Sequence, residues 1–244
     1  MVSKLRPFVF GFRPMPSYNS QRMVAALFIQ RAFEPETQLY FGCVVVTVII
    51  SIVLHELAHG WAAIWQGDDT PKMAGHMTAD PMVHMGGMSL LMLALVGMAF
   101  GAMPVNPRNF RSRFGDALVS AAGPAMNFLL AFAALTALAV WMRLGGIADE
   151  GPAHNGQYLL RIFGVTNIAL GIFNLIPVPP LDGSSVLGNF VPAYRRWLES
   201  LGNPTWMFFI LFMVLWNAPY QYNPFGIAQN VMAAYLGLFG FVMG

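Results

Sequence analysis

Residues 38–65 read QLYFGCVVVTVIISIVLHELAHGWAAIW. A membrane-crossing helix needs about 20 predominantly apolar residues, so this stretch is long enough to span a bilayer. Its ionisable groups gather near the C-terminal end, at His55, Glu56 and His59. Such groups are costly within a span unless they pair with one another or bind an ion. The stretch therefore predicts a membrane helix that carries a polar site at one end.

The composition of the whole chain excludes several classes of protein. Hydrophobic residues make up 57% of the 244 residues and charged residues only 10%, whereas soluble domains have about 45–50% and about 25%. So few charges cannot cover the surface of a soluble enzyme, and so apolar a chain is not disordered. The net charge of +2 gives no basis for nucleic-acid binding. A single cysteine, Cys43, excludes an intrachain disulfide.

Apolar segments separated by polar turns predict an all-α, polytopic membrane protein with about five to six transmembrane helices. The segments that support this prediction are residues 38–65, 86–103, 115–142, 157–176, 205–217 and 224–243. We expect three regions: a basic and partly interfacial N-terminal extension (1–37), a membrane core (38–190) and a C-terminal membrane hairpin (191–244). Within the extension, the apolar residues 23–33 are too short to span and suit an interfacial helix.

His55-Glu56-Leu57-Ala58-His59 is an HExxH motif on the predicted helix. Residues four apart share one helix face, so both imidazoles can bind a single zinc ion. Glu56 can then act as general base on the attacking water, because zinc makes hydroxide available near pH 7. The alternative is a pair of helix-terminal histidines at the membrane interface, but three ionisable groups together at the end of a span argue against it.

A catalytic zinc site also needs a third protein ligand and one open position. Asp182 is a candidate because it follows a span and the proline-rich break at residues 177–180. Irregular backbone at membrane depth is tolerated where it lines a cavity. Asp182 could equally cap a short helix over residues 183–190. The residues alone leave these two roles open.

Two amides and two further histidines are secondary candidates. Asn174 and Asn127 lie in apolar segments, where an amide either bonds a neighbouring helix or donates to the oxyanion of a tetrahedral intermediate. We favour the oxyanion role for Asn174 and the helix contact for Asn127. His76 and His84 could be accessory ligands or gating residues, but ordinary interfacial histidines explain them better.

Taken together, HELAHG (55–60), AGPAMNF (122–128) and FNLIPVPPLDG (173–183) resemble the site-2 protease family of intramembrane zinc metalloproteases. PVNPRNF (104–110) is similar to the compact prokaryotic branch without PDZ or CBS domains, and the resemblance covers roughly residues 40–190. It implies one zinc ion held by His55, His59 and Asp182, with Glu56 as base and Asn174 as an active-site amide.

The resemblance also implies the substrate and the location. It implies hydrolysis of peptide bonds in or near transmembrane segments of membrane-protein substrates, that is, regulated intramembrane proteolysis. The expected surroundings are the bilayer of a prokaryotic cell membrane, which the chain crosses several times. Two alternatives stay open: a membrane-anchored zinc protease that acts on soluble or misfolded chains, and a non-proteolytic zinc-binding membrane protein.

Residues 86–103 set the topology. If they crossed the membrane fully, His55 and His59 would lie at the opposite membrane face from Asp182, although zinc bonds of about 2.0–2.2 Å require the three to meet. We therefore expect this segment to be re-entrant, with its glycines at the bend. The polar residues 66–85 before it, with prolines at 71 and 81, suit extended or hairpin structure.

Overall fold

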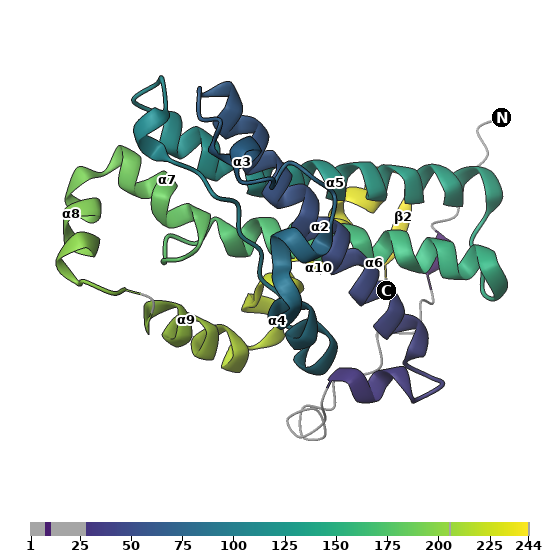
Figure 1. Ribbon diagram of the computed structural model, residues 1–244. Coiled ribbons are helices and arrows are strands. Elements are labelled where there is room, and N and C mark those ends of the chain that lie inside the picture. Colours follow the sequence, from purple (N-terminus) through teal and green to yellow (C-terminus); the bar gives the residue numbers. More distant parts are fainter. Residues whose placement is uncertain (1–7, 11–27, 205, 244) are drawn as a thin grey trace.

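The computed structural model describes residues 8–10, 28–204 and 206–243 (Figure 1). Three long helices form its framework: α2 (Gln38–Trp65), α5 (Gly115–Gly145) and α6 (Gly151–Asn174). Each is long and apolar enough to cross a membrane. The β-branched run in α2 would disfavour a helix in water, but a helix satisfies every backbone group internally, as a bilayer demands. The prediction of a helical membrane protein is confirmed.

The three helices pack as one bundle, with α5 in contact with both α2 and α6. A fourth helix, α10 (Pro224–Gly237), packs against α6 and α5. Glycines allow close approach here, because a Cβ at Gly164 would lie 2.5 Å from Leu135 and one at Gly171 would lie 2.8 Å from Phe128. Small residues at helix contacts are typical of membrane bundles. The apolar core of this bundle comprises Ala131, Leu135, Leu138, Ala139, Met142, Val165, Ile168, Ala169, Ala228, Met232, Leu236 and Phe241.

Between α2 and α5 the chain makes an excursion and returns. It passes through the short helix α3 (Thr70–Met73) and then α4 (Pro81–Val96), which is kinked at Gly86. Gly97, with φ of 79°, ends α4 in the left-handed conformation, which suits glycine because it has no Cβ. The following residues run back along α4: Ala102 N–H donates to His84 O, and Phe100 N–H donates to the Ser89 hydroxyl.

Asp68 holds the two ends of this excursion together. Its carboxylate accepts the Asn106 N–H (2.7 Å), the Asn109 side-chain amide (2.8 Å) and the Thr70 hydroxyl (2.5 Å). Arg111 N–H donates to Gln66 O at the same place. The excursion therefore begins and ends at the C-terminal end of α2, and its re-entry into a membrane stays a prediction. Burial opposes ionisation of Asp68, but these hydrogen bonds outweigh it and hold the pKa of the carboxyl below its ordinary value.

The expectation of extended or hairpin structure before residue 86 is wrong. No strand lies between residues 66 and 103, all of which the structure describes. Asp80 instead caps α4 by accepting the Met82 N–H (2.8 Å), and Pro81 occupies the first helical position, where a missing N–H costs nothing. The prolines that argued against a helix thus start α3 and α4.

The terminal regions complete the fold. The short 3-10 helix η1 (Phe28–Ala32) packs against α2 and α4, with the Phe28 ring against Gly97. Residues 23–27 of the predicted interfacial helix lie outside the described part of the chain.

After α6 come α7 (Asp182–Phe190), α8 (Pro192–Ser200) and the apolar α9 (Trp206–Asn217). Strands β1 (Phe8–Phe10) and β2 (Phe241–Met243) pair in parallel. The expected count of five to six crossings stays a prediction, since α4, α9 and α10 are shorter than the three framework helices.

Candidate metal centre

Helix α2 presents His55 and His59 on one face, one turn apart. Their Nε2 atoms lie 3.0 Å from each other, and both side chains are buried. Each ring is oriented by a bond at its other nitrogen. His55 Nδ1 lies 2.7 Å from the Asn127 side-chain oxygen, and His59 Nδ1 lies 2.7 Å from Val119 O. Because α5 supplies both of these oxygens, the α2–α5 contact sets the direction of both imidazoles.

Asp182 approaches the two histidines from α7, beyond the proline-rich segment at residues 177–180. Its carboxylate oxygens lie 3.2 Å from His55 Nε2 and 3.3 Å from His59 Nε2. Asp182 is the first residue of α7, which starts just after the proline-rich break that ends α6. A Cβ at Gly183 would lie 2.2 Å from Leu175 O, so only glycine lets α7 begin so close to the end of α6.

The carboxylate of Asp182 therefore faces the imidazoles and does not act as a helix cap. The N-cap of α7 is Leu181, without a side-chain cap hydrogen bond. The capping alternative is contradicted by this geometry.

The three converging side chains fit a zinc ion. Val119 O can only accept, so His59 Nδ1 carries the hydrogen and its Nε2 is a bare lone pair in the neutral ring. That lone pair meets the His55 nitrogen and the Asp182 carboxylate, and Asp182 Oδ2 has no hydrogen-bond donor. Tetrahedral zinc with bonds of about 2.0–2.1 Å places its ligands about 3.3 Å apart, close to the 3.0–3.3 Å found here. Two neutral imidazoles and one carboxylate are also a donor set that zinc accepts.

Space beside the ligands is kept free by Gly123 of α5. A Cβ at this position would lie 2.4 Å from His59 Nε2 and 2.5 Å from His55 Nε2. Any side chain there would fill the place that the metal and its fourth ligand need. No other group of three or more His, Cys, Asp or Glu side chains in the described part of the chain could hold a metal ion.

Glu56 is buried next to the ligands and faces the returning segment after α4. A Cβ at Gly101 would lie 2.6 Å from a Glu56 carboxylate oxygen and 2.7 Å from Ile52. The backbone around Gly101, which belongs to no helix or strand, therefore runs next to the carboxylate. The excursion that leaves α2 at Asp68 thus returns to form one wall of the metal centre.

The remaining candidates from the sequence have different surroundings. Asn174 ends α6, and its amide donates to Leu170 O (3.1 Å) within its own helix. Asn127 is fully buried and bonds Asn167 on α6, so its expected helix contact is confirmed. It also contacts the ligand histidine His55, which the sequence did not predict. The structure thus brings Asn127 to the metal ligands, while the hydrogen bond it gives Asn174 is local.

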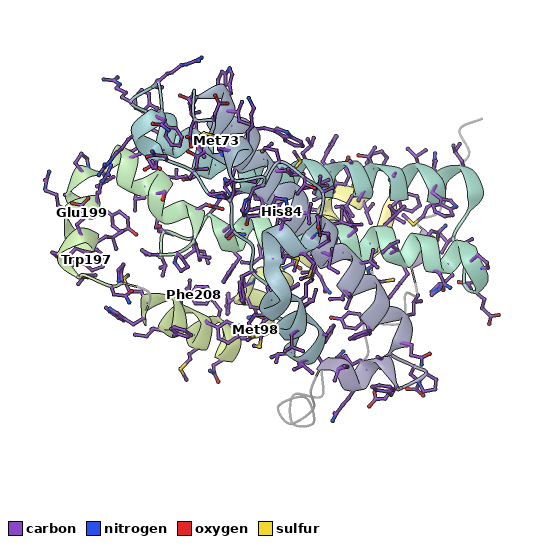
Figure 2. The ribbon with its side chains drawn as sticks, in the orientation of Figure 1. Met73, His84, Met98, Trp197, Glu199 and Phe208 are labelled. Carbon is purple, nitrogen blue, oxygen red and sulfur yellow. The ribbon has the colours of Figure 1, made fainter. Side chains whose placement is uncertain are left out.

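His84 is a buried histidine. It is 3% exposed and lies on α4 where that helix contacts α2 (Figure 2). Its Nε2 lies 2.7 Å from Thr78 O. His76, in contrast, is partly exposed and bonds Ala74 O. Sequence reasoning missed His84 because nothing in the polar segment indicates that α4 folds back onto α2.

A helical membrane protein in which an HExxH helix and a distant aspartate converge on one metal position is, by class, a zinc metalloprotease of the membrane. Residues 43–151 and 143–216 match the model of Peptidase family M50. The chain belongs to this family, that of the site-2 proteases, and is a zinc metalloprotease.

Several curated proteins are similar to it. The chain is 36% identical over 182 residues to "Putative zinc metalloprotease YwhC" of Bacillus subtilis (strain 168). These residues make up 72% of this chain and 80% of that protein. It is 31% identical over 163 residues to "Putative zinc metalloprotease Rip2" of Mycolicibacterium smegmatis, over 61% of this chain and 58% of that protein. The protein of the same name from Mycobacterium tuberculosis is 30% identical over 186 residues, 73% of this chain and 68% of its own. No solved structure matches the chain.

Proposed function

We propose that this zinc metalloprotease hydrolyses peptide bonds in or near transmembrane segments of membrane proteins, in regulated intramembrane proteolysis. The observation that carries the proposal is the place of the metal centre. His55 and His59 belong to a helix long and apolar enough to span a membrane, and α5, which holds both rings in position, is another. A substrate that reaches these ligands from the bilayer is itself a membrane segment.

The residues divide the chemistry among them. His55, His59 and Asp182 would hold the zinc ion, which supplies a Lewis acid and makes hydroxide available near pH 7. Glu56 would accept the proton of the attacking water at its carboxylate and later deliver it to the leaving amine. Asn174 would donate its amide to the oxyanion that develops on the substrate carbonyl. For that role the Asn174 amide must exchange its bond to Leu170 O for one to the substrate.

The extended segment after α4 is the candidate binding surface for the substrate. A transmembrane helix must unwind before water can attack its backbone. An unwound segment can add as an extra strand along exposed extended backbone. Residues 98–106 belong to no helix or strand, pass beside Glu56 at Gly101 and are anchored by the Asp68 carboxylate at Asn106. This support favours a substrate that binds in extended form next to the general base.

The identity of the third ligand favours membrane segments over soluble chains as substrates. Membrane-anchored proteases that act on soluble chains often take a glutamate from a downstream helix as third ligand. Here Glu199 lies on α8 at the outer edge of the molecule (Figure 2), where it pairs with Arg195 at 3.1 Å. Glu150 is the residue before the first turn of α6. Both glutamates are exposed, and Asp182 occupies the third position instead.

We further propose that the protein is a multi-pass protein of the prokaryotic inner membrane, and that its partners are the bilayer and a transmembrane protein substrate.

Substrate capture tests the proposal. Glu56→Gln should keep one zinc ion per chain, because Glu56 is not a ligand, and should lose proteolysis, because the amide cannot take a proton from water. Expressed in bacterial membranes and crosslinked, this variant should retain uncut membrane proteins that the parent does not retain. Capture of soluble proteins alone would support the anchored-protease alternative. Undiminished proteolysis by a zinc-loaded Glu56→Gln variant would rule out the mechanism.

A further inference from the structure

A buried chain of hydrogen bonds connects the metal ligand His55 to two other helices. Asn127 of α5 accepts from His55 Nδ1 (2.7 Å) and donates its Nδ2 to the Asn167 side-chain oxygen on α6 (2.9 Å). Asn167 in turn donates its own Nδ2 to Phe163 O (2.9 Å) and to the Ser51 hydroxyl on α2 (2.8 Å). Asn127, Asn167 and Ser51 are each 0% exposed.

The donor and acceptor roles along this series of hydrogen bonds follow from the Phe163 carbonyl at its end. Phe163 O is a backbone carbonyl, which can only accept a hydrogen bond. Asn167 must therefore present its NH₂ group to Phe163, which leaves its oxygen for Asn127. Asn127 must then donate to Asn167, so its own oxygen faces His55. An oxygen acceptor requires that His55 carry its hydrogen on Nδ1.

The consequence lies at the metal position. A neutral imidazole with its hydrogen on Nδ1 has its lone pair on Nε2, and Nε2 is the atom that faces His59 and Asp182. With Asn127 turned over, its NH₂ group would face His55 Nδ1, and the hydrogen would move to Nε2, where the metal belongs. Turning Asn127 would also leave Asn167 without its donor, in a place with no water exposure. An unsatisfied buried polar group destabilises the folded protein.

We propose that Asn127 and Asn167 are positioning residues, which hold His55 in the Nδ1–H tautomer and orient it for zinc. The side-chain hydrogen bonds of Asn167 go to Asn127, Ser51 and Phe163, none of which is a metal ligand, and Asn167 acts through Asn127. The inference rests on the metal centre, not on the proposed substrate class. It assigns Asn127 a role that differs from both helix contact and oxyanion stabilisation. Outer partners of metal-binding histidines typically change metal affinity by about 10- to 100-fold when they are removed.

The first test measures zinc affinity on detergent-purified, metal-free protein with a competing chelator. Asn127→Leu should weaken binding about 10- to 100-fold, and Asn167→Leu should weaken it about 10-fold despite its distance from the ligands. Asn127→Asp should recover most of the loss, since a carboxylate still accepts from His55 Nδ1. If Asn167→Leu binds zinc like the parent, or Asn127→Asp is as weak as Asn127→Leu, the positioning role is wrong.

Two control variants separate this role from general packing. Ser51→Ala removes one acceptor of Asn167 but leaves Phe163 O, so Asn167 still presents its oxygen to Asn127. Zinc affinity should therefore stay within about threefold of the parent, a smaller loss than the removal of Asn127 or Asn167 causes. Thr136→Val removes a hydrogen bond between α5 and α10, to the Tyr235 hydroxyl at 2.7 Å, without touching the chain. It should also bind zinc like the parent. A loss in either control as large as that of Asn167→Leu would show that bundle stability alone sets zinc affinity.

The second test measures the His55 tautomer in the parent protein and uses a variant only to assign the resonance. In ¹⁵N-histidine spectra of the metal-free parent, His55 should have its hydrogen on Nδ1. His84 is an internal reference of opposite type, because its Nε2 faces the carbonyl of Thr78 and must carry the hydrogen. The His55 resonance is the one that disappears in His55→Gln. A His55 that carries a hydrogen on Nε2 and none on Nδ1 would overturn the proposal.

Discussion

Asp182 is the residue whose role the sequence could state only by resemblance. Both of its carboxylate oxygens lie within 3.3 Å of a histidine nitrogen, and it caps no helix. Asp182→Ala should therefore lower zinc occupancy of the purified protein, as His55→Ala does, because two imidazoles alone hold zinc weakly. Metal analysis after dialysis measures this directly.

The matched control for Asp182 is Asp149, in the short connection between α5 and α6. Asp149→Ala removes the same charge far from the ligands in sequence and should leave zinc occupancy unchanged. Full occupancy in Asp182→Ala would show that Asp182 is not a zinc ligand.

The oxyanion role of Asn174 is not visible in its hydrogen bonding, because its amide donates to Leu170 O of its own helix. If it stabilises the oxyanion, Asn174→Ala should lower kcat by about 10²–10³-fold with unchanged zinc content. Turnover of a captured membrane substrate, together with metal analysis, measures both quantities. A variant of normal specific activity but lower thermal stability would show that Asn174 only supports the helix.

At this scale the sequence predicts local pairs well and distant contacts poorly. His55 and His59 could be assigned because four residues of helix suffice to bring them together. Asp182, 127 positions after His55 along the chain, could be placed only through a resemblance. The contact of Asn127 with His55 was missed, since nothing in an apolar segment tells which side of a helix meets which neighbour. His84 was missed for the same reason.

Among the elements, the excursion between α2 and α5 forms the wall of the metal centre next to Glu56. Its closure depends on Asp68, because this one carboxylate bonds residues on both sides of the excursion. Asp68→Asn replaces an acceptor with a donor opposite the Asn106 N–H. We expect a loss of about 1–3 kcal/mol in stability, measured as a lower Tm in detergent.

The pH dependence of this contribution has a definite sign. The folded-state pKa of Asp68 is lowered, so its stabilisation is present above the unfolded pKa of about 3.9 and is lost as pH falls through the folded value. The Tm difference between the parent and Asp68→Asn should therefore shrink below about pH 3.9. The neighbouring Asp69→Asn is the control, because Asp69 forms only an exposed pair with Lys72, and it should change Tm little. Equal effects of the two substitutions would contradict the closure role.

Accessibility tests whether the excursion is re-entrant in a membrane. In a Cys43→Ser background, single cysteines at Asp69 and Arg111 should react with an impermeant reagent from the same face. The reason is structural, since Arg111 N–H bonds Gln66 O and Asp68 bonds Asn106. Labelling from opposite faces would show that residues 86–103 cross the bilayer, and another route for Asp182 to the metal would then be needed.

The elements also show what periodicity can and cannot predict. The limits of α2 follow from its uninterrupted apolar run, and the structure has the helix at the same residues, 38–65. The run at 86–103 is short and broken by glycines, so its pattern fits a span, a loop or a bent helix. The structure makes it a kinked helix and an extended return because side chains far apart in sequence, Ser89 with Phe100 and Asp68 with Asn106, bond each other. Local composition carries no signal for such bonds.

At the scale of the whole molecule, the three long apolar helices form the framework (Figure 1). The metal centre lies between His55 and His59 of α2 and Asp182 of α7, and the excursion begins and ends just beyond it, at Asp68. Helix α10 supports α5 and α6 from the side. Helix α9 meets α6 through the Phe173 and Phe208 rings, whose centroids lie 6.1 Å apart. The packed part of the molecule thus fixes the ligands, and the extended segment at Gly101 offers backbone next to the base. This arrangement suits hydrolysis of a chain that arrives from the bilayer.

The position of the cleaved bond tests that claim most directly. A membrane protein captured by Glu56→Gln should be reconstituted in liposomes with the parent enzyme, and the products measured by mass spectrometry. We expect one cut within or beside the transmembrane segment, no cut with Glu56→Gln, and loss of the cut when zinc is removed. Cleavage confined to a soluble region far from the membrane segment would contradict intramembrane proteolysis by this protein.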